Sequence, residues 1–68
     1  MNAAHLALMA NQILKNFAVK GEDAAVTETA KHIHDFWEPR MIEALIVSHA
    51  VAEPQMRKLV TLLRADEF

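Results

Sequence analysis

"FWEPRM", residues 36–41, is the stretch that decides the fold of this chain. It holds the single tryptophan and one of the two prolines. The residue before a proline avoids helical backbone angles, so a helix should be interrupted at Glu38. Proline itself is favoured at the first position of a helix, so a new helix should begin at Pro39. The stretch therefore predicts a corner between two helices.

Similar signals mark the other helix ends. The pair "EP" at 53–54 repeats the corner, with its break near Glu53. Gly21, the single glycine, lies where a helix can close through a left-handed residue. Asn2 belongs to the residue types that cap a helix start. Together these signals predict four helices, at about residues 2–19, 23–36, 39–51 and 54–65.

Apolar residues recur at helical spacing inside these segments. The stripes of the first two predicted helices are Leu6, Met9, Ala10, Ile13, Leu14 and Phe17, then Val26, Ala30, Ile33 and Trp37. In the third, apolar residues cover more than one face, so this helix should be buried on two sides. We predict an all-α fold: a small bundle of about four short helices with proline-marked corners, in a single domain spanning residues 1–68.

The chain is short for an independently stable domain. A domain of 68 residues buries only about 60% of the surface that its unfolded chain exposes. The absence of cysteine excludes disulfides and thiolate metal sites. Association with another chain is the remaining common way to add stability. We therefore expect a partner subunit, or a homodimer when the chain is isolated.

Charge and hydropathy restrict the class of partner. The formal net charge is −2, and the seven Lys and Arg residues are spread along the chain. Nucleic-acid binding needs a basic patch, so a helix-turn-helix nucleic-acid binder is disfavoured. No run of 18 apolar residues is present, and the first residues lack the basic start of a signal peptide. We expect a cytoplasmic protein with no nucleic-acid or membrane partner.

Motifs for catalysis and nucleotide binding are absent from the sequence. One glycine cannot supply a phosphate loop, a dinucleotide fingerprint or an oxyanion loop. Ser48 is the only serine, and no glycine-rich turn presents it. The sequence therefore predicts no catalytic residue and no cofactor-binding residue.

Histidine and methionine leave one alternative function open. The residues concerned are His5, His32, His34 and His49, with Met9, Met41 and Met56 in or near the apolar stripes. No two histidines are four residues apart, so a metal site would need ligands from separate helices. Methionine at such positions usually fills the core. A small helical bundle that binds a ligand or metal through His and Met is the alternative.

The aromatic corner has two interpretations. In the first, Phe36 and Trp37 fill the space between helices and Arg40 is merely solvated. In the second, Trp37 and Arg40 bind a partner, because tryptophan and arginine dominate the energetics of interfaces. Asn11 and Gln12 are candidate neighbours at that surface, because amides in the middle of a helix suited to burial need hydrogen-bond partners.

Two stretches together resemble a known family. "MANQILKNF" (9–17) and "HIHDFWEPRM" (32–41) are similar to segments of the small delta subunit of cytoplasmic NAD-dependent formate dehydrogenases, and the resemblance covers nearly the whole chain. Glu38 stands where that family usually has aspartate. Aspartate caps a helix better than glutamate does, so the departure weakens a cap and leaves the expected fold unchanged.

The resemblance implies a function that the residues alone do not. It implies an accessory subunit, without catalytic activity of its own, in a molybdenum- or tungsten-containing complex that oxidises formate to CO2 and reduces NAD+. In that family the large catalytic subunit holds the metal–pterin cofactor and iron–sulfur clusters, and other subunits hold flavin and NAD. The delta subunit is expected to hold no cofactor. It is expected to bind the large subunit and to assist assembly, stability or cofactor maturation.

Overall fold

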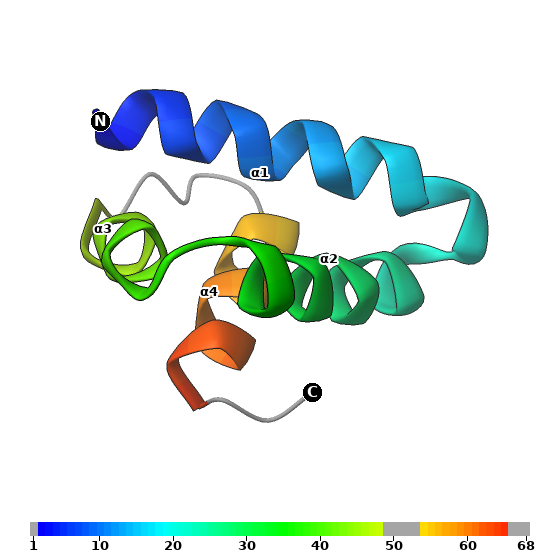
Figure 1. The fold of residues 1–68 in the computed structure, drawn as a ribbon. Coiled ribbons are helices and arrows are strands. Elements are labelled where there is room, and N and C mark those ends of the chain that lie inside the picture. Colours follow the sequence, from blue (N-terminus) through cyan, green and yellow to red (C-terminus); the bar gives the residue numbers. More distant parts are fainter. Residues whose placement is uncertain (1, 49–53, 66–68) are drawn as a thin grey trace.

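The computed structural model describes residues 2–48 and 54–65, and all of its regular structure is helical (Figure 1). The elements are α1 (Ala3–Phe17), the 3₁₀ turn η1 (Ala18–Lys20), α2 (Glu22–Phe36), α3 (Pro39–Ser48) and α4 (Pro54–Ala65). No strand occurs within the described ranges. The prediction of an all-α bundle of four helices is confirmed. Across the same ranges, no helix combines the length and the apolar character needed to span a bilayer.

Asn2 caps the start of α1, as predicted. Its backbone is extended, and its side-chain oxygen accepts a hydrogen bond of 2.9 Å from the backbone N–H of His5. This bond satisfies one of the N–H groups that the first turn of a helix leaves unpaired. At the other end, α1 stops at Phe17 and tightens into η1, whereas the predicted helix continued to residue 19.

Gly21 joins η1 to α2 in a conformation that differs from the prediction. Its φ is 101° and its ψ is 159°. The φ is positive, as expected, but the ψ lies far from the left-handed helical value of about 47°. The Gly21 N–H donates to the carbonyl of Ala18 at 3.1 Å, and its own carbonyl accepts from the N–H of Ala25 at 2.9 Å. One glycine therefore ends the 3₁₀ turn and begins the next helix.

The predicted corner at residues 36–41 is present. Trp37 leaves α2 with an extended backbone (φ −89°, ψ 148°), and α3 begins at Pro39. The carbonyl of Glu38 accepts from the N–H groups of Met41 and Ile42, at 2.9 and 3.2 Å, so it opens the hydrogen-bond ladder of α3. The predicted break near Glu53 and the last predicted residues of the third helix, 49–51, lie outside the described residues.

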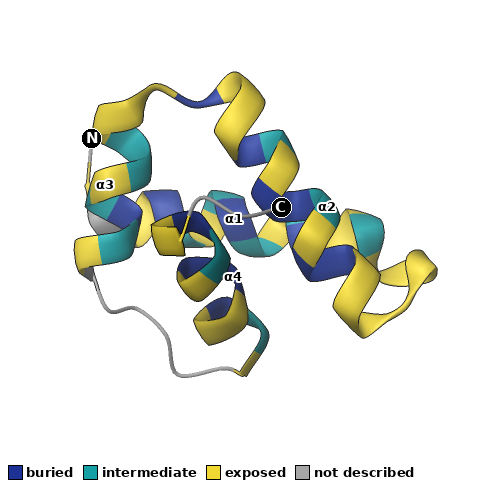
Figure 2. Ribbon diagram, turned by 90° about the horizontal axis from the view of Figure 1, so that it is seen from below, coloured by how far each residue is buried: buried dark blue, intermediate teal, exposed yellow. Residues whose placement is uncertain are grey.

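The helix α2 is central to the packing. The chain reverses through η1, so α1 and α2 lie side by side and antiparallel, and α4 packs against α2 (Figure 1). The shorter α3 packs against α1 and α4. The core cluster takes buried side chains from all four helices: Leu6, Ala10, Leu14, Val26, Ala30, Ile33, Trp37, Leu45, Met56, Leu59 and Leu63. Figure 2 shows these buried stripes facing inward, while the residues of η1 are exposed.

One polar side chain interrupts this apolar interior. Thr29 on α2 is fully buried, and its hydroxyl has no hydrogen-bond partner among the described residues. An unpaired buried hydroxyl costs free energy, because it loses its bonds to water without replacing them. Thr29 therefore weakens the core at the helix that contributes most to it.

Candidate partner-binding surface

Trp37 lies in the core. Its side chain is 9% exposed and belongs to the core cluster. It extends the α2 stripe of Val26, Ala30 and Ile33, being four residues after Ile33. The core interpretation therefore describes this side chain. A role for Trp37 in docking stays a prediction.

Phe36 occupies the surface position. It is 76% exposed, so the core interpretation is wrong for this residue. One residue along a helix is a rotation of about 100°, which takes Phe36 off the buried stripe that Trp37 extends. The Phe36 ring packs against His32 with ring centroids 4.8 Å apart. In the sequence, the place of Phe36 beside the apolar stripe is the signal that indicates this exposure.

Arg40 and Trp37 line two different hollows. The Arg40 side chain is exposed and lines a groove of about 330 Å³ between α1 and α3, with Leu6, Glu38, Met41 and Ala44. Trp37 and Pro39 line a second groove of about 380 Å³, with His34, Ile42, Glu43, Ile46 and Leu63. The helix α3 forms a wall shared by the two grooves. The corner therefore presents two surfaces rather than one combined docking point.

Asn11 and Gln12 both lie on α1. Asn11 is half-buried and Gln12 is exposed. Gln12 is two residues from the fully buried Ala10, about 200° around α1, so it faces away from the core. Neither amide is among the described residues that line the groove of Arg40. Among the described residues, the four predicted residues therefore do not line one common groove, and their role in docking stays a prediction.

The described histidines and methionines are dispersed. Within residues 2–48 and 54–65, no three His, Cys, Asp or Glu side chains are grouped closely enough to hold a metal ion. His34 lies 3.3 Å from the Asp35 carboxylate at a half-exposed position. Met56 is buried in the core. Met9 and Met41 are partly buried and pack against the core cluster. His49 lies outside the described residues.

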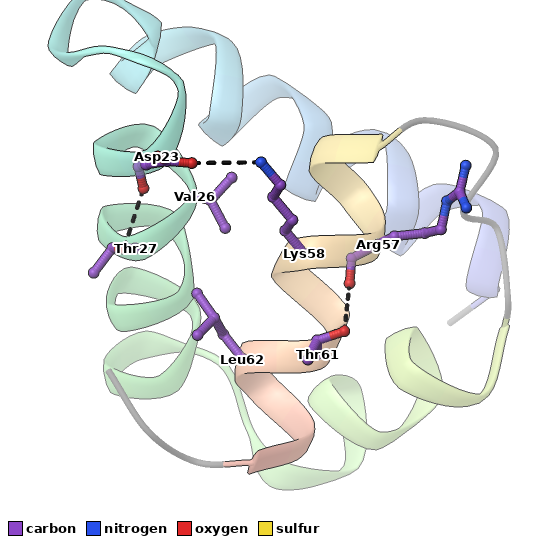
Figure 3. Close-up of a pocket in the computed structure, with 7 residues that line it drawn as sticks. All are labelled: Asp23, Val26, Thr27, Arg57, Lys58, Thr61 and Leu62. Atoms are coloured by element: carbon purple, nitrogen blue, oxygen red, sulfur yellow. Dashed lines mark hydrogen bonds and ion pairs between the residues drawn. The ribbon is translucent and has the colours of Figure 1, made fainter.

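A third groove, which the sequence pattern does not predict, separates α2 from α4. It has a volume of about 460 Å³, and its lining is Asp23, Val26, Thr27, Arg57, Lys58, Thr61 and Leu62. Lys58 Nζ reaches across it to Asp23 Oδ1 at 3.4 Å (Figure 3). The helix α4, which borders this groove, has three cationic side chains and no acidic one.

A family model described as NADH-dependent formate dehydrogenase delta subunit, FdsD, matches residues 5–65. The chain belongs to this family. Comparison with curated proteins and with solved structures gave no significant match. The match to the delta-subunit family runs from the first turn of α1 to the end of α4, so it includes all three grooves and the 36–41 corner. The resemblance found in the sequence is confirmed.

Proposed function

We propose that this chain is a cytoplasmic, non-catalytic accessory subunit that binds the large catalytic subunit of a formate dehydrogenase. It would assist the assembly, the stability or the cofactor maturation of that subunit. The observation that carries the proposal is the match of residues 5–65 to the delta-subunit family. A delta subunit of a multisubunit enzyme has partner subunits, so a binding role follows more directly from that membership than a reaction does.

The composition of the chain supports a role without catalysis. The sequence has no cysteine to ligate an iron–sulfur cluster and one glycine, which is too few for a nucleotide-binding loop. That glycine joins two helices at the surface. Among the described residues, the buried side chains are apolar apart from Thr29. These features suit a small folded surface that another subunit recognises.

We propose that the predicted residues serve docking from separate positions. Arg40 is an exposed planar fork that can form paired hydrogen bonds with a carboxylate or with backbone carbonyls. Trp37 would contact the partner mainly through the groove that it lines between α3 and α4. Asn11 and Gln12 would meet the partner along α1. A partner that contacts all four must therefore extend over both α1 and α3.

The test is capture of the enzyme by the tagged full chain. The probe is the formate dehydrogenase complex prepared without its delta subunit. We expect stoichiometric capture of the large subunit, and we expect the isolated chain neither to oxidise formate nor to bind NAD+. Failure to capture the large subunit would contradict the binding role, and formate oxidation by the isolated chain would contradict the non-catalytic role.

A further inference from the structure

The outer face of α4 carries a concentrated positive charge. The exposed residues of this helix are Pro54, Arg57, Lys58, Thr61, Arg64 and Ala65. At 100° per residue they cover one continuous arc of about 120°, with Thr61 near its middle. Arg57 and Lys58 lie at opposite edges of the arc, and Arg64 lies beside Arg57. The helix has no acidic residue to balance them.

An apolar surface adjoins the Lys58 edge of this face. Val26 of α2 and Leu62 of α4 face each other across the groove between the two helices (Figure 3). Lys58 extends over this groove toward α2, whereas Arg57 points away from α2 (Figure 3). Arg57 and Lys58 therefore lie on opposite edges of the outer face of α4, and the groove beside Lys58 has room for an apolar side chain.

These cations are available to a new partner. The ion pair between Lys58 and Asp23 joins side chains that are 53% and 92% exposed, and exposed pairs of this kind add little stability. An incoming carboxylate could replace Asp23 at small cost. Within the described part of the chain, neither Arg57 nor Arg64 has an ion pair with a carboxylate. An arginine without such an ion pair can bind an incoming carboxylate through two parallel hydrogen bonds.

We propose that the outer face of α4 and the adjoining α2–α4 groove bind an acidic, amphipathic segment of a partner polypeptide. Its carboxylates would pair with Arg57, Lys58 and Arg64, and an aliphatic side chain would enter the groove over Val26 and Leu62. That the partner is a polypeptide rests on the proposed function. This surface is distinct from the groove of Arg40, whose lining comes from α1, α3 and the corner between α2 and α3.

The surroundings favour a polypeptide over other anions. Asp23 borders the groove, Glu22 is the residue before it in the chain, and both side chains are exposed. A continuous phosphate backbone or an anionic membrane would therefore meet negative charge beside the cations. The chain as a whole carries a net charge of −2. A polypeptide can place individual carboxylates only where the cations lie. The apolar floor also suits a side chain and offers nothing to a phosphate.

The experiment measures binding of the full chain to the formate dehydrogenase complex that lacks this subunit. The test variant is Arg57→Glu/Lys58→Glu. The matched control is Lys20→Glu/Lys31→Glu, which makes the same charge change at exposed residues of η1 and α2. We expect the test variant to weaken the Kd at least tenfold and the control to stay within twofold of the wild type. Equal Kd values for the test variant and the wild type would overturn the proposal.

Further measurements distinguish a loss of binding from a loss of folding, and a polypeptide partner from other anionic partners. Lys58→Ala, which places no carboxylate near Asp23, should retain the wild-type melting temperature and still weaken binding. Zero-length coupling of amines to carboxylates should link Lys58 to an Asp or Glu of the large subunit. Titrations with a DNA duplex and with anionic phospholipid vesicles complete the set. If the test variant loses binding to either of these while its binding to the enzyme is unchanged, the polypeptide assignment is wrong.

Failure of the proposed function would be recognised separately. If the wild-type chain does not bind the enzyme complex at all, the accessory role fails. The surface is then tested with a synthetic amphipathic helix that carries glutamates on one face and leucines on the other. Binding of this peptide to the wild type, with loss in Arg57→Glu/Lys58→Glu, would support the surface. Absence of binding to the wild type would overturn it.

Discussion

Phe36 and Trp37 are neighbours in the chain, but Trp37 is buried in the core and Phe36 lies on the surface. Trp37 is 9% exposed, and Phe36 is 76% exposed. The last residue of α2 keeps the helical rotation, and the next residue turns the backbone into the corner. The two aromatic rings should therefore have different consequences when they are removed.

Trp37→Ala should destabilise the isolated chain, and Phe36→Ala should not. Truncation of a buried aromatic side chain costs about 3–5 kcal/mol, whereas a surface change away from special features stays within about 0.5 kcal/mol. For a domain of this size, 1 kcal/mol corresponds to about 4–8 °C in melting temperature. Thermal melts of both variants check the contrast. A Trp37→Ala chain that melts with the wild type would contradict the core position.

Thr29→Val should raise the melting temperature. The substitution removes the unpaired buried hydroxyl and keeps nearly the same shape, so we expect a gain of about 1 kcal/mol. Thr27→Val is the matched control, because the Thr27 hydroxyl is exposed and donates to the Asp23 carbonyl at 3.1 Å. The control should not stabilise the chain. Denaturant unfolding of the two variants gives the comparison, and a destabilised Thr29→Val would show that the hydroxyl has a partner.

Gly21 should tolerate no ordinary side chain, and the reason is its backbone. A built Cβ would meet nothing within 4 Å, so crowding plays no part. The combination of φ 101° and ψ 159° belongs to a region that is essentially restricted to glycine and costs other residues about 1–3 kcal/mol. Gly21→Ala should therefore lower the melting temperature.

Two further substitutions at position 21 distinguish this conformation from the left-handed helical one. Gly21→Asn should be as harmful as Gly21→Ala, because the positive-φ region that asparagine tolerates is the left-handed helical one, and the ψ of Gly21 lies outside it. A chemically synthesised chain with D-alanine at position 21 should melt near the wild type, because the mirror-image angles lie close to extended backbone. Rescue by asparagine would show that residue 21 adopts left-handed helical angles after all.

How far the sequence predicted this structure depends on the range of the interaction. The Asn2 cap and the Pro39 start involve residues within four positions of each other, and both were predictable from local chemistry. The exposure of Phe36 was predictable in principle, because it lies beside the stripe that Trp37 extends. The ion pair of Asp23 with Lys58 joins residues 35 positions apart. Single-residue patterns carry no information on which helices pack together, so the α2–α4 groove could not be predicted.

The isolated chain should self-associate, most simply as a dimer. Its accessible surface is 4461 Å², near the value of about 4300 Å² expected for a compact monomer of 7.7 kDa. The total is ordinary, so association would come from the exposed apolar side chains Leu8, Val19, Phe36 and Val47. Light scattering should give a dimer mass, and Phe36→Glu should shift it toward monomer. Monomer mass at high concentration with a sharp melt would count against this.

Arg40→Ala should separate docking from folding. The side chain is exposed at the first turn of α3, and it has no ion pair with a carboxylate in the described residues, so the isolated chain should keep its stability within about 0.5 kcal/mol. If Arg40 is central to the interface, the variant should bind the large subunit more weakly by roughly 2 kcal/mol or more. The measurement is a titration of the complex that lacks the delta subunit, with a melt of the same preparation.

Two comparisons give that titration its meaning. Lys31→Ala removes an exposed cation from α2 and should bind as the wild type does. Gln12→Ala changes an exposed amide on the outer face of α1, and a loss of affinity there would place α1 in the same interface as Arg40. If Arg40→Ala and Gln12→Ala both bind like the wild type, the 36–41 corner serves only to turn the chain. Docking would then depend on other surfaces, such as the outer face of α4, which combines three cationic side chains with an adjoining apolar groove.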